Sequence, residues 1–360
     1  TDIYLPALPQ MVIDFATTPA KINLTLSCYT FGIAISVLFV GELSNRYGRR
    51  RLLISAGLGY ALGALIIANS RFLSIIIIFR LIQSISAGIT IIVCRLVIKD
   101  TMNHVEQLKA TGVILLGIIL SPAIAPVIGA YLTQYFGWRS AFWFIFIISV
   151  PLVYAIIRFI PETNLNTLKK FNSTKYYLHV YLSLLTNKTF VSNALIAATT
   201  TGPLFAFLGI SSYLFILNWH FTPESYSYLY FLISGAYLFG NIIMQILNKT
   251  RFSLDEIIKY GMYFSIIGVI LMVLSVFFAT TLTIIVIIIA MFLMRAANAL
   301  IAPTTQVKIL NSFNDCSAQA IGLSFCINFI FNSLAINGVT VFSNRPLFGL
   351  VSVSFIFITL

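Results

Sequence analysis

Long apolar stretches separated by short polar turns repeat along the whole chain. Stretches such as residues 75–79 and 284–289 are continuously apolar, whereas a membrane β-strand alternates apolar and polar positions. A helix needs about 20 mainly apolar residues to cross a bilayer, and most of the stretches reach that length. The pattern therefore predicts an all-α membrane protein with twelve transmembrane helices.

The predicted spans fall into two groups of six. The first holds only residues 1–9, where we expect Pro6 and Pro9 to end the helix before a polar segment, and the last span is also short. We therefore expect a fragment whose first and last helices are truncated. The remaining spans are predicted at 22–43, 52–69, 72–97, 110–135, 140–160, 189–217, 225–247, 254–279, 282–310 and 317–342, with the short last one at 346–360.

Residues 161–188 interrupt the pattern, because they carry several Lys, Asn and Thr residues and no sustained apolar run. The sequence thus predicts an N-terminal six-helix bundle (1–160), a cytoplasmic linker (161–188) and a C-terminal six-helix bundle (189–360). Two bundles around a site at the middle of the membrane allow many secondary transporters to alternate access.

Composition agrees with this architecture: 59% of residues are hydrophobic and 9% charged, against about a quarter charged in soluble domains. The net charge of +12 comes from residues scattered among short loops, so we expect no nucleic-acid partner. Most Lys and Arg residues fall on one predicted side, which the positive-inside rule identifies as cytoplasmic. The exceptions are Lys21, Arg71, Arg139 and Arg345 on the opposite side and Arg80 and Arg295 inside spans.

The most informative polar segment is the turn at residues 41–51 (GELSNRYGRRR) between the second and third spans. Its arginines must lie outside the hydrocarbon, so the loop 44–51 is predicted to be cytoplasmic. Two glycines in it permit a tight reversal. A purely topogenic basic turn would explain the arginines but not the spacing of the glycines.

This turn resembles the signature loop of the major facilitator superfamily. Other segments resemble the bicyclomycin-resistance (Bcr/CflA) type of drug:proton antiporter in that superfamily. They are Thr1-Asp2-Ile3-Tyr4-Leu5-Pro6-Ala7-Leu8-Pro9, Arg80-Leu81-Ile82-Gln83, Ala125-Pro126-Val127-Ile128-Gly129 and Gly137-Trp138-Arg139-Ser140-Ala141-Phe142. The resemblance is strong over residues 1–163 and thinner afterwards.

The resemblance implies a cytoplasmic gate at the turn. Its residues are Gly41, Glu42, Asn45, Arg46, Gly48, Arg49 and Arg50. Asn45 stands where the signature has aspartate, and an amide brings no negative charge to a helix terminus or to Arg49. The gate is then either weaker, or Glu42 supplies the charge.

Four polar residues are expected in the pathway of the proton and the substrate in the N-terminal half: Asp2, Tyr4, Arg80 and Gln83. An ionisable residue within a span is a functional candidate, and Asp2 in particular can bind and release a proton. Asp2 is equally compatible with an interfacial position. Arg80 and Gln83 lie three residues apart and share a helix face, so we expect Arg80 to point into a central cavity. A structural interhelix clamp is the alternative for Arg80.

The C-terminal half has a similar pair, Arg295 and Asn298, which we also expect to face the pathway. In the fifth span, small residues at every fourth position are interleaved with prolines and resemble the antiporter motif of the superfamily. These residues are Gly117, Ser121, Pro122, Ala125, Pro126 and Gly129. Close helix packing alone is the other interpretation.

The resemblance implies a proton-coupled exporter of drugs and small amphipathic compounds, with no cofactor and the proton gradient as energy source. A metabolite transporter on the same scaffold, or a non-transporting or decayed membrane protein, are the alternatives. Coupling to Na⁺ stays open. We expect no enzyme and no metal site, because the cysteines and the loop histidines His104, His179 and His220 show no ligand spacing. The expected partners are a drug-like molecule and membrane lipid, and we expect a monomer.

Overall fold

The computed structural model describes residues 2–164, 174–249, 252–278, 280–313, 316–342 and 344–360. In these residues the chain forms helices and connecting turns and no strands, which confirms the all-α prediction. The N-terminal half comprises η1 (Asp2–Ala7), α1 (Leu8–Asp14), α2 (Pro19–Tyr47), α3 (Arg49–Asn69), α4 (Leu73–Thr101), α5 (His104–Phe136) and α6 (Arg139–Phe159).

The C-terminal half begins with a helix that the sequence analysis did not predict, α7 (Thr174–Thr186), within the predicted linker. The other elements are α8 (Lys188–Ser212), η2 (Tyr213–Asn218), α9 (Pro223–Lys249), α10 (Leu254–Leu274), η3 (Ser275–Phe277), α11 (Thr280–Ser312), α12 (Ser317–Thr340) and α13 (Pro346–Thr359). The division into bundles at 160 and 189 stays a prediction.

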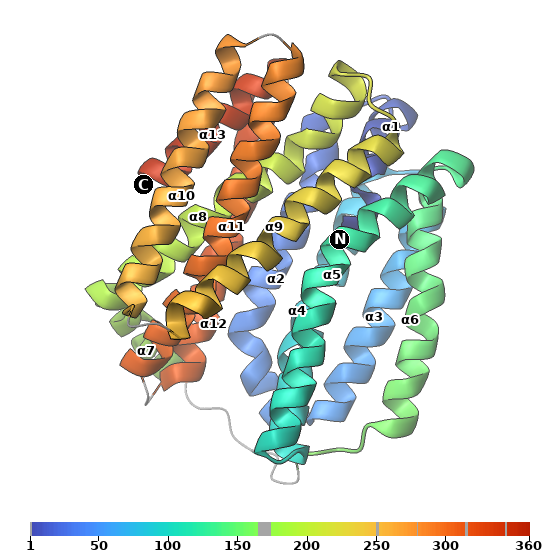
Figure 1. The fold of residues 1–360 in the computed structure, drawn as a ribbon. Coiled ribbons are helices and arrows are strands. Elements are labelled where there is room, and N and C mark those ends of the chain that lie inside the picture. Colours follow the sequence, from blue (N-terminus) through green and yellow to red (C-terminus); the bar gives the residue numbers. More distant parts are fainter. Residues whose placement is uncertain (1, 165–173, 250–251, 279, 314–315, 343) are drawn as a thin grey trace.

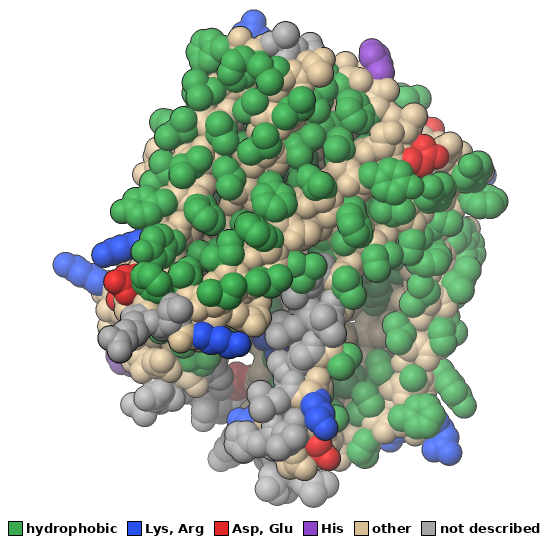
Figure 2. All heavy atoms as spheres, in the orientation of Figure 1, with side chains coloured by type: hydrophobic (Ala, Val, Ile, Leu, Met, Phe, Trp, Pro, Cys, Tyr) green, Lys and Arg blue, Asp and Glu red, His purple; other side chains and the backbone are tan. Residues whose placement is uncertain are grey.

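Within the described residues, nine helical segments are long and apolar enough to cross a membrane. The long helix α5, the shorter apolar helix α13 and the η1–α1 segment occupy the remaining expected positions. Figure 2 shows hydrophobic side chains over the middle of the visible face, with Lys and Arg side chains near one end. This distribution fits a helical bundle surrounded by lipid.

The two halves repeat the same packing and lie side by side (Figure 1). α4 packs against α2 and α3 in the first half, and α11 packs against α9 and α10 in the second. The halves meet where α2 runs along α12 and α5 along α9. We name the two ends of the bundle the Gly48 end, with the α2–α3 turn, and the Gly137 end, with the α5–α6 turn.

The largest core cluster spans both halves at the Gly137 end. It joins Tyr4, Trp138 and Phe142 of the first half to Phe215 and Tyr226 of the second. Asn23 of α2 also donates a hydrogen bond to the carbonyl of Gly209 on α8, at 2.6 Å. The halves are therefore joined through a dry, aromatic-rich contact at this end.

The structure differs from the sequence predictions in several local features. Pro6 and Pro9 do not end a helix, because Pro6 lies within η1 and Pro9 in the first turn of α1, where a missing N–H costs no hydrogen bond. The reversal predicted for 41–51 occurs at Gly48 alone, since α2 continues to Tyr47.

The polar connection predicted between α4 and α5 shrinks to two residues. Asn103 and Glu106 cap each other's backbone N–H groups at 3.0 Å, so polar residues that read as a loop start a helix instead. Two histidines expected in loops lie in helices: His104 begins α5, and His179 lies in α7.

Candidate functional site

The side chain of Arg80 is enclosed by aromatic rings in the N-terminal half. Its guanidinium carbon lies 4.3 Å from the ring centre of Tyr4 on η1, 4.4 Å from that of Tyr29 on α2 and 5.9 Å from that of Phe142 on α6. The residue is 0% exposed. Contacts with the ring faces offset part of the cost of removing this cation from water.

Few polar groups compensate the charge of Arg80. Its Nη1 donates to Oε1 of Gln83 at 3.4 Å, and Nε2 of Gln83 donates to the carbonyl of Tyr60 at 3.2 Å. Among the described residues, Nε and Nη2 of Arg80 have no hydrogen-bond partner and no acid forms an ion pair with it. The shared face of Arg80 and Gln83 is thus confirmed. In this structure the rings of Tyr4 and Tyr29 cover Arg80, and the expectation that it points into a central cavity stays a prediction.

The η1 segment links this arginine to the other half. The hydroxyl of Tyr4 lies 3.1 Å from Oγ1 of Thr25, which itself donates to the carbonyl of Ile22. Asp2 is half-buried at the start of η1. The η1 segment contacts α8 and α9 of the C-terminal half. Asp2 therefore lies where the two halves meet, and its role as a proton carrier stays a prediction.

The C-terminal half repeats the arrangement around Arg80 in a more open form. Nη1 of Arg295 donates to Oδ1 of Asn298 at 3.3 Å, and the guanidinium carbon lies 4.6 Å from the ring centre of Tyr237 on α9. Arg295 is half-buried, and Nδ2 of the buried Asn298 has no partner among the described residues. Both arginines therefore combine an amide three residues later with a tyrosine ring from the corresponding helix.

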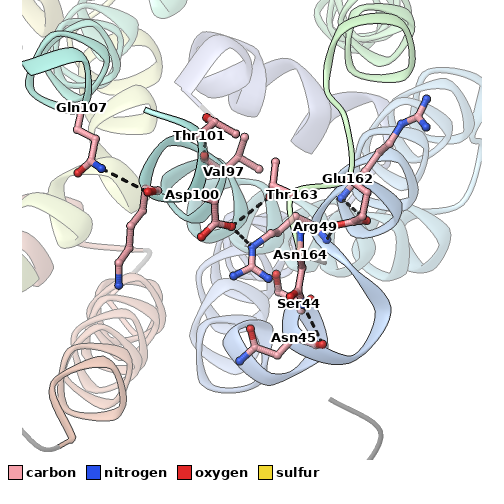
Figure 3. Close-up of polar contacts among 12 residues, drawn as sticks. Ser44, Asn45, Arg49, Val97, Asp100, Thr101, Gln107, Glu162, Thr163 and Asn164 are labelled. Carbon is pink, nitrogen blue, oxygen red and sulfur yellow. Dashed lines mark hydrogen bonds and ion pairs between the residues drawn. The ribbon is translucent and has the colours of Figure 1, made fainter. Parts of the chain in front are cut away.

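At the Gly48 end, a carboxylate closes the α2–α3 turn (Figure 3). Gly48 has φ +87°, a conformation that favours glycine, and a Cβ there would lie 2.7 Å from Cδ of Glu162. The Glu162 carboxylate accepts hydrogen bonds from the backbone N–H of Arg49 at 2.8 Å and of Arg50 at 3.2 Å. It thus caps the N-terminus of α3 with a negative charge, where a helix dipole favours one.

Arg49 joins the same turn to the end of α4. Its Nε forms an ion pair with Oδ2 of Asp100, and Oγ1 of Thr163 donates to that oxygen at 3.1 Å. Nη2 of Arg50 donates to the carbonyl of Ile157 on α6 at 2.7 Å. The turn consequently ties together α3, α4 and the end of α6.

Asn45 takes no part in this ion pair. Its backbone carbonyl accepts a hydrogen bond from Nδ2 of Asn164 at 3.0 Å, and its side chain points away from Arg49 in Figure 3. Glu42 is half-buried in α2, and whether it replaces the missing acid is untested. Arg46 is exposed over the Tyr47 ring, at 5.2 Å. Gly41 has open space around it, so its predicted part in the reversal is wrong.

Burial alone raises the pKa of Glu162, but hydrogen bonds from the backbone N–H groups of Asn164, Arg49 and Arg50 outweigh it and hold the pKa below its ordinary value. The carboxylate is therefore charged at neutral pH, which is the form that caps α3.

The sequence analysis missed both acids of this site. Asp100 lies in the polar connection after the span predicted to end at 97, and Glu162 lies at the start of the predicted linker, and neither is among the expected site residues. The available signal was their position: both spans end on the side of the basic turn, so their terminal acids lie near its arginines.

The small-residue ladder of α5 is only partly used for close packing. A Cβ at Gly129 would collide with the backbone carbonyl of Ile3, so η1 approaches α5 closely there. Ala125 and Pro126 lie toward the same contact, half-buried and buried. Gly117 has open space around it, Ser121 is exposed and Pro122 half-buried. Whether the ladder sets antiport stays a prediction.

The chain is similar to several curated transport proteins. It is 26% identical over 267 residues to an uncharacterized transporter of Rickettsia bellii (strain RML369-C), covering 74% of this chain and 66% of that protein. It is 23% identical over 246 residues to the bicyclomycin resistance protein homolog of Haemophilus influenzae, covering 67% and 61%. The chain thus matches less than two thirds of the length of these relatives.

The fold is similar to a solved D-xylose-proton symporter, with a TM-score of 0.74 and 14% identity over 99% of this chain and 93% of that one. At this identity the likeness concerns the fold alone. A family model, the Major Facilitator Superfamily, matches residues 1–336. With its twelve predicted span positions, repeated halves and glycine-arginine turn, the chain belongs to the Major Facilitator Superfamily of membrane transporters.

Proposed function

We propose that this chain exports small amphipathic, drug-like compounds from the bacterial cytoplasm in exchange for protons, by alternating access. The observation that carries the proposal is the enclosed charge of Arg80, which lies beside η1, the segment that holds Asp2. Within the described part of the chain its Nε and Nη2 have no hydrogen-bond partner. A buried cation without a counter-ion is costly, so a state in which an acid or substrate reaches it is favourable. The similarity to the bicyclomycin resistance protein homolog of Haemophilus influenzae favours a drug over other solutes.

In the proposed cycle, Asp2 binds a proton when the pathway opens at the Gly137 end and releases it when substrate enters from the Gly48 end. Rearrangement of η1 changes the cover of Arg80, because Tyr4 lies directly over the guanidinium. Arg295, Asn298 and Tyr237 contribute the second wall of the pathway, and the Gly48 turn with Arg49 and Glu162 latches one end. Chloramphenicol-like and bicyclomycin-like compounds are the proposed substrates.

For location, we propose the inner membrane with residues 44–51 and 161–188 in the cytoplasm, and a monomer. Cysteine labelling of position 46 from the cytoplasmic side alone, in spheroplasts and inverted vesicles, tests this orientation.

Transport by the full-length protein in proteoliposomes tests the function. An imposed pH gradient should drive accumulation of radiolabelled chloramphenicol, and a protonophore should abolish it. Asp2→Asn and Arg80→Gln should each lower the gradient-driven flux at least about tenfold, by analogy with loss of a coupled ionisable group. Lys308→Ala, which removes a partly exposed side chain paired with Asp255, should leave it unchanged. Flux that does not depend on the pH gradient, or that is unchanged by both substitutions, contradicts the proposal.

A metabolite transporter is the second candidate. Two buried amide atoms, Nδ2 of Asn298 and Oδ1 of Asn332, have no hydrogen-bond partner among the residues that the structure describes, and such atoms suit a hydroxyl-rich solute. A panel of labelled sugars, nucleosides and drugs in the same proteoliposomes separates the two, since uptake of a metabolite where drugs give none favours this candidate.

A further inference from the structure

The surface of α7 is divided into three faces. Leu178, Leu182 and Leu185 recur at the i, i+4, i+7 spacing of one helical stripe and are 58%, 52% and 47% exposed. His179, Ser183 and Thr186 follow as an exposed polar stripe beside it. Val180, Tyr181 and Leu184 face the protein. We call the three exposed leucines the leucine stripe.

The protein-facing side is firmly attached. Leu184 is 1% exposed in a cluster with Phe190 of α8, Ile309 of α11 and Leu323 of α12. The hydroxyl of Tyr181 donates to the carbonyl of Leu38 on α2 at 3.2 Å. α7 is thus held in one orientation at the Gly48 end, beside α12 (Figure 1), and that orientation leaves the leucine stripe uncovered.

An apolar stripe between a protein-facing and a polar face is the pattern of a helix that lies in a membrane interface. There, leucines enter the acyl-chain boundary while polar residues remain among the headgroups. In water the same stripe would expose three large apolar side chains side by side.

Charge identifies the kind of surface that fits. Residues 165–188 contain Lys169, Lys170, Lys175 and Lys188 and no Asp or Glu. Lysines near a bilayer surface are attracted by anionic headgroups and not by zwitterionic ones. The hydroxyls of Ser183 and Thr186 donate to backbone carbonyls within the helix. They therefore offer a protein partner no unpaired hydroxyl donor.

We propose that α7 is a membrane-interface helix, whose leucine stripe inserts into the leaflet at the Gly48 end and whose lysine-rich sequence favours anionic phospholipid. In this proposal α7 is seated on the bilayer and does not lie free in the cytoplasm. Since the Tyr181 hydroxyl contacts α2 and α7 packs against α8 and α12, the lipid-bound helix bridges both halves. This inference depends on the membrane fold and not on the proposed substrate.

Depth measurement on the full-length protein tests the proposal. A nitroxide is attached to Leu182→Cys, and for the matched control to its polar neighbour Ser183→Cys, after replacement of Cys28, Cys94, Cys316 and Cys326. The protein is placed in nanodiscs of phosphatidylcholine with or without phosphatidylglycerol. The ratio of oxygen to nickel-chelate accessibility should be at least about threefold higher at 182 than at 183, and higher again at 182 with phosphatidylglycerol.

Equal ratios at the two positions would overturn the proposal. So would a label at 182 that is immobilised and shielded from both reagents, because another protein surface would then cover the stripe. If phosphatidylglycerol leaves the ratio unchanged, the preference for anionic lipid is wrong. Should the cysteine-free chain not fold, Leu182→Trp and Ser183→Trp in the otherwise unchanged chain replace the labels. Brominated lipid should then quench the added fluorescence at 182 only.

Discussion

The two halves build the same corner at the Gly48 end with opposite charges. In the first half Arg49, at the start of α3, pairs with Asp100 at the end of α4. In the second half Asp255, at the start of α10, pairs with Lys308 near the end of α11. The helices correspond in the two halves, so the ion pair is kept in place while its polarity is reversed.

The corners differ in where the helix cap comes from. Ser253 and Glu256 cap α10 from within its own first turn, with Glu256 N–H donating to Ser253 Oγ at 3.3 Å and Ser253 N–H donating to Glu256 Oε2 at 2.7 Å. The cap of α3 is Glu162, which is 113 positions away from Arg49 in the chain. One corner is thus assembled locally and the other only by tertiary folding.

Solvent exposure separates them further. The side chains of Arg49 and Asp100 are 10% and 24% exposed, against 25% and 68% for Lys308 and Asp255. Charges shielded from water interact more strongly, and removing one partner of a shielded pair lowers stability more. The first corner is therefore a coupled unit of three elements, and the second a set of weak, separable contacts.

The largest effect is expected from Gly48→Ala. The backbone at φ +87° disfavours any side chain, and the added methyl group meets the Glu162 carboxylate. The free energy of unfolding should fall by about 3 kcal/mol, measured by SDS denaturation in mixed micelles. Gly41→Ala is the control, because Gly41 lies in α2 with open space around it and should cause no loss. Equal effects of the two changes would contradict the observed turn.

The Arg49–Asp100 pair should come next. Arg49→Gln is expected to lower the free energy of unfolding by about 2 kcal/mol, less than for a fully buried pair because Asp100 is partly exposed. A double-mutant cycle with Asp100→Asn should give a coupling energy of about 1 kcal/mol. Additive effects of the two changes would show that the pair contributes nothing.

Glu162→Gln should lower the free energy of unfolding by about 1.5 kcal/mol at neutral pH, because it weakens the cap on α3. Because the pKa of Glu162 is lower in the folded chain than its ordinary value, the carboxylate stabilises the fold above that value. The contribution is lost as the pH falls through the folded pKa. Stability of the unmodified protein and of the glutamine variant should thus converge as the pH falls from neutral through the folded pKa of Glu162. A difference that stays constant over this range would assign the effect to packing.

The local cap of the second corner should matter less. Ser253→Ala is expected to lower the free energy of unfolding by about 1 kcal/mol, with little dependence on Arg49, since the capping box is confined to one turn. Combining it with Arg49→Gln should give additive losses. Marked non-additivity would mean that the two corners are coupled.

The smallest effect is expected from Lys308 and Asp255, the more exposed of the two ion pairs. Lys308→Ala should change the free energy of unfolding by about 0.3 kcal/mol, and raised salt should remove even that. A loss as large as that of Arg49→Gln would overturn the contrast between the corners.

Local signals in the sequence predicted most of the fold. Each polar residue placed in lipid has its own free-energy cost, so span positions and the basic turn follow from short windows of sequence. The i, i+3 pairs Arg80/Gln83 and Arg295/Asn298 followed from helix periodicity. Helix ends were less predictable, because mutual capping by Asn103 and Glu106 extends a helix into residues that read as a loop.

The sequence by itself determined that this chain is a helical membrane protein of two similar halves and where its arginines turn the chain. Only the tertiary structure decided what those arginines meet. Tyr4, Tyr29 and Phe142 reach Arg80 from three separate elements, and Asp100 and Glu162 reach the Gly48 turn from the ends of two others. Hydrophobic periodicity places a residue at a depth and on a helix face, whereas its partner depends on how distant helices pack against each other.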